Sequence, residues 1–314
     1  RNHLTRESFR IGNVLSCVPP GLELKGAQYE FTAIEHCRVH RDPLLHEGHP
    51  VVMAVGGTAL KTLLGLHGHD RVRIDEFHGT VQRDPEDRFW VVPTYHTSFL
   101  QRGAHNLIGT VSFDLQVALE VMRREWPQEP IDLVLDPPPD WFEAWVQLVE
   151  AAVAQDPEGV RINCDVETPD KAGGKPENEL GPDDTSYQIT RYNFAVNRDQ
   201  GVTVPAEGPY LPLIKRVLEL ACPHDWWNGS GYDWARVLAA GNALQLLHQY
   251  DLMLGAHVLQ SDVPLGLGFW APFYSRYGAW KHLSRSSPIE YACIDGPQGY
   301  RVACGVIGDL IQEG

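Results

Sequence analysis

The stretch Val160-Arg-Ile-Asn-Cys-Asp-Val-Glu167 decides the fold of the second half of this 314-residue chain. Its apolar run predicts a buried strand that ends at two acids, Asp165 and Glu167. Because successive side chains of a strand point to opposite faces, the two carboxylates are expected on the same side of that strand. One Asp-x-Glu pair is a weak signal by itself, since acids are also common at solvated strand ends.

Strand and helix patterns alternate after this strand, and they predict a mixed α/β sheet covered by helices on its faces. The predicted elements are a hairpin over Tyr187–Val204, a strand over His224–Asn228, and helices over Tyr210–Ala221, Tyr232–Ala240, Asp251–Gln260 and Pro288–Ile311. Within the last helix, Gly296-Pro297 predicts a break, because proline lacks the amide hydrogen and disfavours helical geometry at the residue before it.

The first part of the chain shows the same alternation of strand and helix patterns. It predicts strands over Pro50–Val55 and Phe89–Thr94 and helices over Thr58–Leu64 and Val111–Arg124. Residues 126–158 are rich in proline and predict a linker with a short helix at Trp141–Val153. We therefore expect two α/β domains, residues 1–125 and 159–314, joined by this linker.

The composition limits the class of protein. A hydrophobic fraction of 43% excludes wholesale disorder, and no apolar run approaches the ~20 residues of a membrane-spanning helix. Six cysteines are too few for a disulfide framework, which favours the cytoplasm. The net charge is −15; residues 1–125 carry 14 basic and 15 acidic side chains, so the excess lies in the second half. This excess of negative charge argues against broad, non-specific electrostatic binding of nucleic acid.

Two further motifs follow the Asp-x-Glu pair in chain order. Asn228-Gly-Ser-Gly-Tyr-Asp233 surrounds a tight turn, and Tyr291-Ala-Cys-Ile-Asp295 places a tyrosine and an acid on one helix face. The ordered set resembles the DEDDy-type 3′–5′ exonucleases, the ribonuclease H-like proofreading domains of family A DNA polymerases. Gln249–Leu259, which contains Asp251, is similar to the helix start between the second and third motifs of that family.

The resemblance implies a metal-dependent 3′–5′ exonuclease that removes nucleotides from single-stranded DNA or DNA 3′ ends. Phosphodiester hydrolysis of this kind uses two Mg²⁺ or Mn²⁺ ions, which need carboxylate oxygens as ligands and offset the repulsion among converging acids. The metal ligands that the resemblance implies are Asp165, Glu167, Asp233 and Asp295. Tyr291 would orient the attacking water, and Asn228 and Asp251 would support the site or only the fold. A helix break at Pro297 would misplace the carboxylate of Asp295.

Three stretches of the first part resemble the C-terminal portion of family 4-type uracil-DNA glycosylases, which have an α/β/α sandwich fold. They are Gly12–Pro20, Val51–Leu60 and Thr94–Arg102. The resemblance implies that the motif residues are Asn13, His96, Ser98 and Arg102, with His96 facing a departing uracil anion and Ser98 and Arg102 on phosphate. Cys17 and Cys37 match two of the four ligands of a [4Fe–4S] cluster in that family.

The first glycosylase motif and the first cysteine pair would both lie upstream of Arg1, so we expect an N-terminally incomplete module that docks DNA. A cluster would then form only in a longer parent chain. The pairing of the two domains resembles the front end of bacteriophage-type DNA polymerase I-like proteins, which implies a polymerase domain after residue 314 and the cytoplasm of a bacterium or infected host. The alternatives are a uracil-excising base-excision repair protein and a non-catalytic DNA-binding scaffold.

Overall fold

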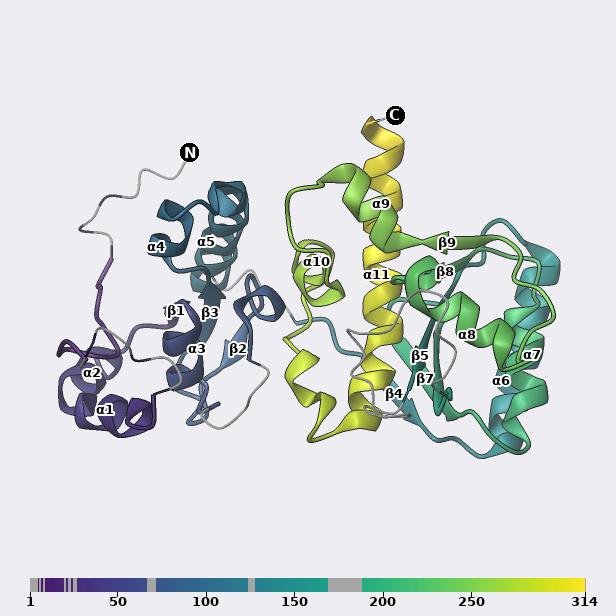
Figure 1. The fold of residues 1–314 in the computed structure, drawn as a ribbon, viewed down its shortest axis with the longest axis horizontal. Helices are drawn as coiled ribbons and strands as arrows, with labels where there is room; N and C mark the ends of the chain where they lie inside the picture. Colours follow the sequence, from purple (N-terminus) through teal and green to yellow (C-terminus); the bar gives the residue numbers. More distant parts are fainter. Residues whose placement is uncertain are drawn as a thin grey trace. The chain divides into compact units, whose positions relative to one another are not determined.

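The computed structural model describes residues 9–19, 27–66, 72–123, 128–168 and 188–313, together with residues 5, 7, 21 and 24. It divides into two compact units, Arg1–Pro127 and Gln128–Gly314, and each has its own sheet (Figure 1). Helices and mixed sheets make up both units, which confirms the α/β class. Among the described residues, no helix combines the length and apolar character needed to cross a membrane.

The second unit is built on a six-stranded mixed sheet with the order β4-β7-β6-β5-β8-β9. The strands are β4 (Asp132–Leu135), β5 (Ile162–Glu167), β6 (Arg191–Ala195), β7 (Gln200–Pro205), β8 (His224–Trp226) and β9 (Gln249–Asp251). The predicted hairpin is confirmed, since β6 pairs antiparallel with β7 and also with β5. The pairs β4·β7, β5·β8 and β8·β9 are parallel.

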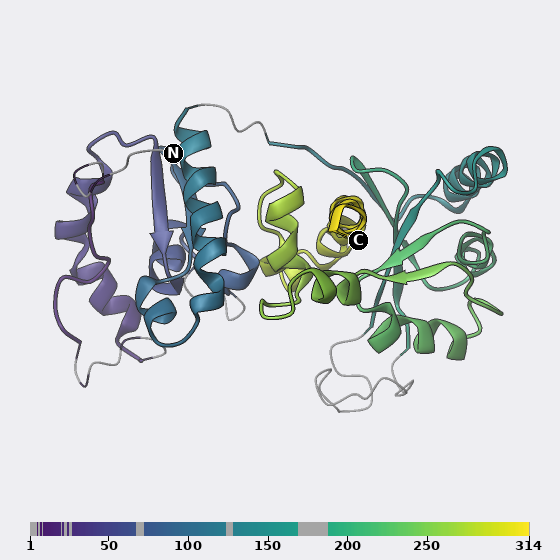
Figure 2. The ribbon, with the colours of Figure 1, turned by 90° about the horizontal axis from the view of Figure 1, so that it is seen from above.

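Helices cover both faces of this sheet. Seen along the edge of the sheet, α6 and α7 lie on one side, and α11 crosses the other side (Figure 2). The helices are α6 (Pro139–Gln155), α7 (Tyr210–Leu218), α8 (Trp234–Ala239), α9 (Leu252–Leu259), α10 (Leu267–Tyr274) and α11 (Pro288–Glu313). The predicted helices of this half are therefore present, with ends shifted by a few residues.

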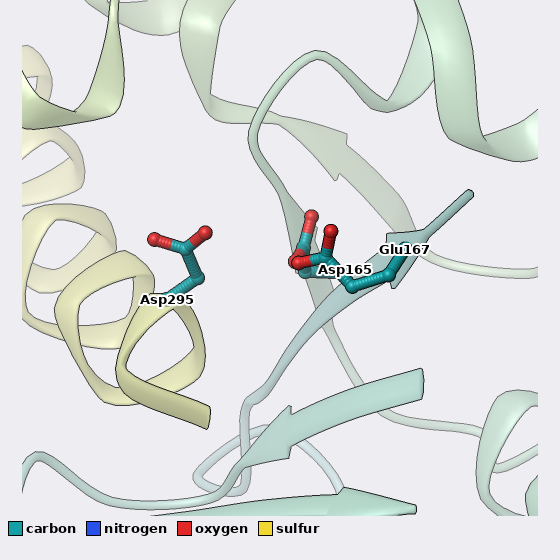
Figure 3. A group of neighbouring side chains, drawn as sticks. All are labelled: Asp165, Glu167 and Asp295. Atoms are coloured by element: carbon teal, nitrogen blue, oxygen red, sulfur yellow. The ribbon is translucent and has the colours of Figure 1, made fainter. Parts of the chain in front are cut away.

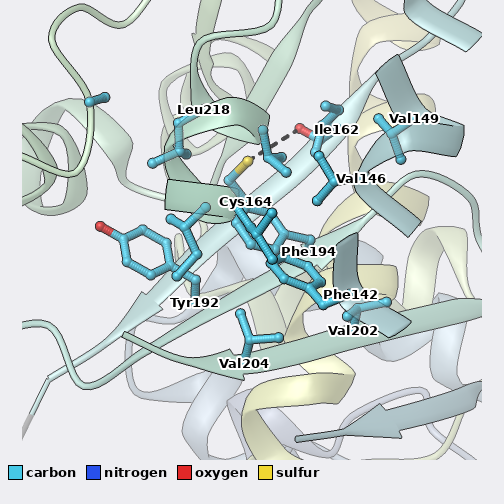
Figure 4. Packing of buried hydrophobic residues seen from close by; sticks show 14 of the residues in the cluster. Phe142, Val146, Val149, Ile162, Cys164, Tyr192, Phe194, Val202, Val204 and Leu218 are labelled. Carbon is cyan, nitrogen blue, oxygen red and sulfur yellow. Dashed lines mark hydrogen bonds between the residues drawn. The ribbon is translucent and has the colours of Figure 1, made fainter. Parts of the chain in front are cut away.

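The main hydrophobic core fills the space between the sheet and the α6–α7 pair (Figure 4). Phe142 of α6 stacks on Phe194 of β6, with ring centroids 6.2 Å apart. The other labelled members are Val146, Val149, Ile162, Cys164, Tyr192, Val202, Val204 and Leu218. Burial of this many apolar side chains gives the unit its main source of stability.

Residues 128–158 belong to the second unit, and their prediction as a linker is wrong. β4 pairs in parallel with β7, and α6 buries Trp145 and Val149 in the core. The prolines do not interrupt these elements, because Pro139 occupies the first turn of α6, where an amide hydrogen is not needed. The boundary between the units lies at Pro127, about thirty residues before the expected start of the second domain.

The last helix, α11, continues through Pro297, so the predicted break after Asp295 is also wrong. Pro297 cannot bond to the carbonyl of Cys293, and that carbonyl lies against β7. A Cβ atom added to Gly201 would be 2.3 Å from the Cys293 oxygen, and one added to Gly299 would be 2.4 Å from Asn163 Oδ1. Gly201 of the sheet and Gly299 of α11 have no side chain, so the helix can lie directly on the sheet. This close packing keeps the helix continuous across Pro297.

The first unit contains a three-stranded sheet with the order β1-β3-β2, in which β1 and β3 are parallel. The strands are β1 (Val51–Val55), β2 (Gln82–Arg83) and β3 (Trp90–Thr94). The helices are α1 (Glu30–His36), α2 (Arg38–Leu45), α3 (Gly57–Leu63), α4 (Thr97–Gln101) and α5 (Ile108–Met122). Both predicted strands and both predicted helices are confirmed, and α5 buries Val117 and Val121 against the sheet.

Candidate metal centre

Strand β5 separates the hydrophobic core from a polar face. Cys164 and Val166 point into the core, whereas Asp165 and Glu167 lie on the face that α11 covers. Asn193 of β6 pairs with Asp165 in register and donates from Nδ2 to Asp165 Oδ2 at 2.8 Å and to Glu167 Oε1 at 3.4 Å. The predicted placement of both carboxylates on one side of the strand is confirmed.

Helix α11 brings a third carboxylate to this face (Figure 3). Ligand oxygens of Asp165, Glu167 and Asp295 all lie within 4.8 Å of one another. Asp295 Oδ1 accepts hydrogen bonds from Trp280 Nε1 at 2.6 Å and from Lys281 Nζ at 2.7 Å. These two bonds hold the Asp295 carboxylate in place through Oδ1.

Tyr291 lies one turn before Asp295 on α11. Its hydroxyl accepts a hydrogen bond from Lys281 Nζ at 3.3 Å. Burial, together with the charge of Asp295, raises the pKa of Tyr291 well above its usual value. The raised pKa favours the neutral phenol, which suits a hydrogen-bond donor.

Asp233, the fourth acid of the expected set, does not join the three-carboxylate group of the described residues. It ends the π-helical turn Gly229–Asp233 and is buried, with 3% of its surface exposed. Burial raises its pKa, and the negative charge of Asp165 adds to the effect. Asp233 is thus electrostatically coupled to the centre from a separate position, and the structure brings together three of the four predicted ligands.

Asp251 and Asn228 serve the fold around this turn. Asp251 caps α9 by accepting from the amides of Met253 and Leu254, and it also accepts from the amide and hydroxyl of Ser230. Asn228 adopts a left-handed conformation, φ 74°, that reverses the chain before Gly229. Of the two roles that the sequence left open for these residues, their contacts support the structural one.

Replacing Asp251 by alanine is expected to lower the free energy of unfolding by about 2 kcal/mol, since it removes a helix cap and the bonds to Ser230. Thermal and chemical denaturation measure this loss. Asp251→Asn is the matched control, because its side-chain oxygen still accepts from the helix amides. It should lose less than half of the free energy that Asp251→Ala loses. Mn²⁺ affinity should stay within about threefold of the wild type, and a complete loss of Mn²⁺ binding would place Asp251 in the site.

The three carboxylates are close enough to disturb one another's ionisation. Burial raises the pKa of Glu167 to about 9, with Asp165 and Asp295 adding to the effect, and burial and Asp295 raise the pKa of Asp165 to about 7. A centre that disfavours its own negative charge is suited to a divalent cation, since oxygen ligands of this kind are those that Mg²⁺ and Mn²⁺ prefer.

These shifts predict a pH-dependent stabilisation by metal. The pKa values in the folded chain lie above the usual values of 3.8 and 4.5, so the metal-free chain loses stability as pH rises from about 4 to about 9. Mg²⁺ binds the ionised carboxylates, so its shift of the melting temperature should grow over the same range. Melting curves with and without Mg²⁺ near pH 6 and pH 8.5 measure this, and equal shifts at both values would contradict it.

The glycosylase-like residues of the first unit come together only in part. His96 begins α4, where its Nδ1 accepts from the Ser98 amide at 3.1 Å and lies 2.7 Å from Ser98 Oγ. Arg102 donates to Ser98 Oγ at 3.3 Å. Cys17 Sγ and Cys37 Sγ are 3.8 Å apart. Asn13 is exposed, and no described contact joins it to this group.

Sequence reasoning missed three residues that shape the metal centre, namely Asn193, Trp280 and Lys281. Asn193 had a usable signal, because it is a polar residue between two aromatic residues in the strand Arg191–Ala195. Trp280 and Lys281 precede α11 in a segment with no pattern, and only the tertiary packing places them against Asp295. Comparison of the chain with protein-family models and with curated proteins finds no match.

Proposed function

We propose that the second unit is a metal-dependent 3′–5′ exonuclease acting on DNA 3′ ends. The observation that supports this best is the meeting of Asp165 and Glu167 of β5 with Asp295 of α11, with ligand oxygens within 4.8 Å. Elements far apart in the sequence converge there, and the carboxylates lie on the face of the sheet opposite its hydrophobic core. The order of these motifs along the chain supports the same reaction.

The donor set fits Mg²⁺ or Mn²⁺, since it offers carboxylate oxygens alone. Asp165, Glu167 and Asp295 would hold one cation, and Asp233 beside Asp165 is the candidate fourth ligand for a second. Bound cations lower the pKa of water and stabilise negative charge on the leaving oxygen. The neutral hydroxyl of Tyr291 would donate to and orient the attacking water.

For the first unit we propose a DNA-docking role. His96 and Arg102 flank the short helix α4, both contact the hydroxyl of Ser98, and together they present polar and cationic groups suited to a phosphate. Two cysteines side by side are consistent with half of a cluster site in a longer chain. We place the chain in replication or repair, working with a polymerase domain of the same or another protein.

One assay separates this function from its alternatives. The purified chain is incubated with 5′-labelled single strands, with and without uracil, in Mg²⁺ or in EDTA. The proposal expects stepwise loss of 3′ nucleotides in Mg²⁺ only, irrespective of uracil. Alkali-labile sites at uracil that persist in EDTA would indicate a glycosylase, and intact strands under every condition would indicate a binding scaffold.

A further inference from the structure

Lys281 is a cation placed inside the acidic centre, in the short 3₁₀ turn Lys281–Ser284. Its side chain is 17% exposed, and its Nζ contacts Asp295 at 2.7 Å and Tyr291 at 3.3 Å. A basic side chain therefore contacts both the acid and the tyrosine that α11 brings to the centre.

We propose that Lys281 is a positioning residue that orients Asp295 and Tyr291, and that its positive charge limits the three-carboxylate group to a single divalent ion. This inference rests on the proposed exonuclease function and adds to it a residue, a role and a metal stoichiometry. Its three consequences concern the orientation of Asp295, the orientation of Tyr291 and the charge of the centre.

The first consequence is a fixed carboxylate. Lys281 and Trp280 both donate to Oδ1 of Asp295, which leaves no freedom for that carboxylate to rotate without losing two hydrogen bonds. The bond from Lys281 is charge-assisted, so it is the stronger kind of hydrogen bond. The carboxylate is thereby held where one of its oxygens lies within 4.8 Å of ligand oxygens of Asp165 and Glu167.

The second consequence is a fixed orientation of the Tyr291 hydroxyl group. An ammonium group has donors only, so Tyr291 must use an oxygen lone pair toward Lys281 and cannot donate its own hydrogen there. The ammonium also lies 4.8 Å from the centre of the Tyr291 ring, which holds the ring against it. The O–H of Tyr291 consequently points away from Lys281, and in the proposed reaction that hydrogen is the one offered to the attacking water.

The third consequence concerns charge. Three ionised carboxylates and one ammonium leave a net charge of −2, which one divalent cation neutralises. A second cation held by this group would leave an excess of positive charge, and Asp233 lies outside the group of described carboxylates. We therefore expect one tightly bound ion in the DNA-free protein, and any second ion to bind weakly until phosphate arrives.

The test compares Lys281→Met and Lys281→Arg, with Lys215→Met as the matched control. Lys215 is on α7, and its nearest carboxylate partner is Glu219 at 4.0 Å. Free Mn²⁺ measured by electron paramagnetic resonance gives the stoichiometry and affinity of metal binding. Hydrolysis of a single strand gives kcat and KM, and melting curves check that each variant is folded.

For Lys281→Met we expect opposite movements of two quantities. Mn²⁺ binds about tenfold more tightly, because a competing charge is gone, while kcat falls about thirtyfold with KM within about threefold. Lys281→Arg should restore wild-type Mn²⁺ affinity and recover kcat to within about fivefold, and Lys215→Met should match the wild type. If Lys281→Met does not fold, Lys281→Gln replaces it: without the charge Mn²⁺ should bind about tenfold more tightly, and kcat should fall by less than about thirtyfold because N–H donors remain.

Two results would overturn the role of Lys281. One is an unchanged kcat in Lys281→Met; the other is weaker Mn²⁺ binding that falls in step with kcat, as expected of a lysine that only stabilises the fold. Two tight Mn²⁺ ions in the wild type would refute the single-ion stoichiometry. Failure of the exonuclease proposal is distinguishable, since wild-type protein would then bind one Mn²⁺ and respond to Lys281→Met without degrading DNA.

A double-mutant cycle tests whether Lys281 affects kcat through the hydroxyl of Tyr291. If Lys281 acts by orienting that hydroxyl, substitution of Lys281 should affect kcat less in a variant that already lacks the hydroxyl. The effect of Lys281→Met on kcat should fall from about thirtyfold in the wild type to about threefold or less in Tyr291→Phe. Equal effects in both backgrounds would show that Lys281 does not work through Tyr291.

Discussion

Asp165→Asn should lower kcat for Mg²⁺-dependent removal of 3′ nucleotides by about a thousandfold or more. Asp165 is the central carboxylate of the centre, because it shares the candidate cation with Glu167 and Asp295 and is electrostatically coupled to Asp233. The substitution keeps the shape of the side chain and its acceptor for Asn193, but it removes the charge. Steady-state hydrolysis of a labelled single strand measures the effect.

The same variant has a second expected property that separates loss of function from loss of fold. The ionised Asp165 is disfavoured in the metal-free chain, which is why its pKa is raised to about 7. The metal-free variant should therefore melt at or above the wild-type temperature near pH 8, and it should lose the stabilisation by Mg²⁺.

Asp140→Asn, an exposed change in the first turn of α6, is the control and should leave hydrolysis unchanged. Persistent Mg²⁺-dependent hydrolysis in Asp165→Asn would contradict the assignment of the centre.

Gly201→Ala should cost about 3 kcal/mol of the free energy of unfolding, more than an ordinary methyl insertion. The added Cβ would lie 2.3 Å from the backbone oxygen of Cys293 and 3.0 Å from Pro297 Cδ. Neither atom is the end of a flexible side chain, so α11 itself has to move away from β7. Urea denaturation measures the loss of stability.

Because α11 carries Asp295, this packing change should also reach the metal centre. A displaced helix separates Asp295 from Asp165 and Glu167, so Mn²⁺ affinity should fall by about tenfold or more. Gly308→Ala is the matched control on the same helix: its new Cβ meets nothing within 4 Å, and the change should leave stability equal or up to about 1 kcal/mol higher. A Gly201→Ala variant as stable as the wild type would show that the contact is not rigid.

The local part of this architecture follows from the sequence. The strand that carries Asp165 and Glu167, the hairpin after it and the helix that carries Asp295 each have a periodic pattern within one segment. The strand pattern was sufficient to put both acids of β5 on one face. Chain order and resemblance, without spatial information, were sufficient to select Asp295 as their partner.

The features that the sequence did not predict depend on contacts between segments that are distant in the chain. β4 is a short strand within a proline-rich run, and it is stabilised by pairing with β7 about seventy residues later. The helix continues past Pro297 because Gly201 allows close packing beneath it. The position of Asp233 depends on a left-handed residue and a π-helical turn, and that of Lys281 on a segment without periodicity.

The most direct test of the central proposal compares two forms of one DNA strand, a 5′-labelled linear strand and the same sequence closed into a circle. Each is incubated with the purified chain in Mg²⁺, and the products are separated at single-nucleotide resolution. We predict a ladder that shortens from the 3′ end of the linear strand, an intact circle, and no ladder with Asp165→Asn. Cutting of the circle, or a linear strand that stays intact in Mg²⁺ and Mn²⁺, would contradict a 3′–5′ exonuclease.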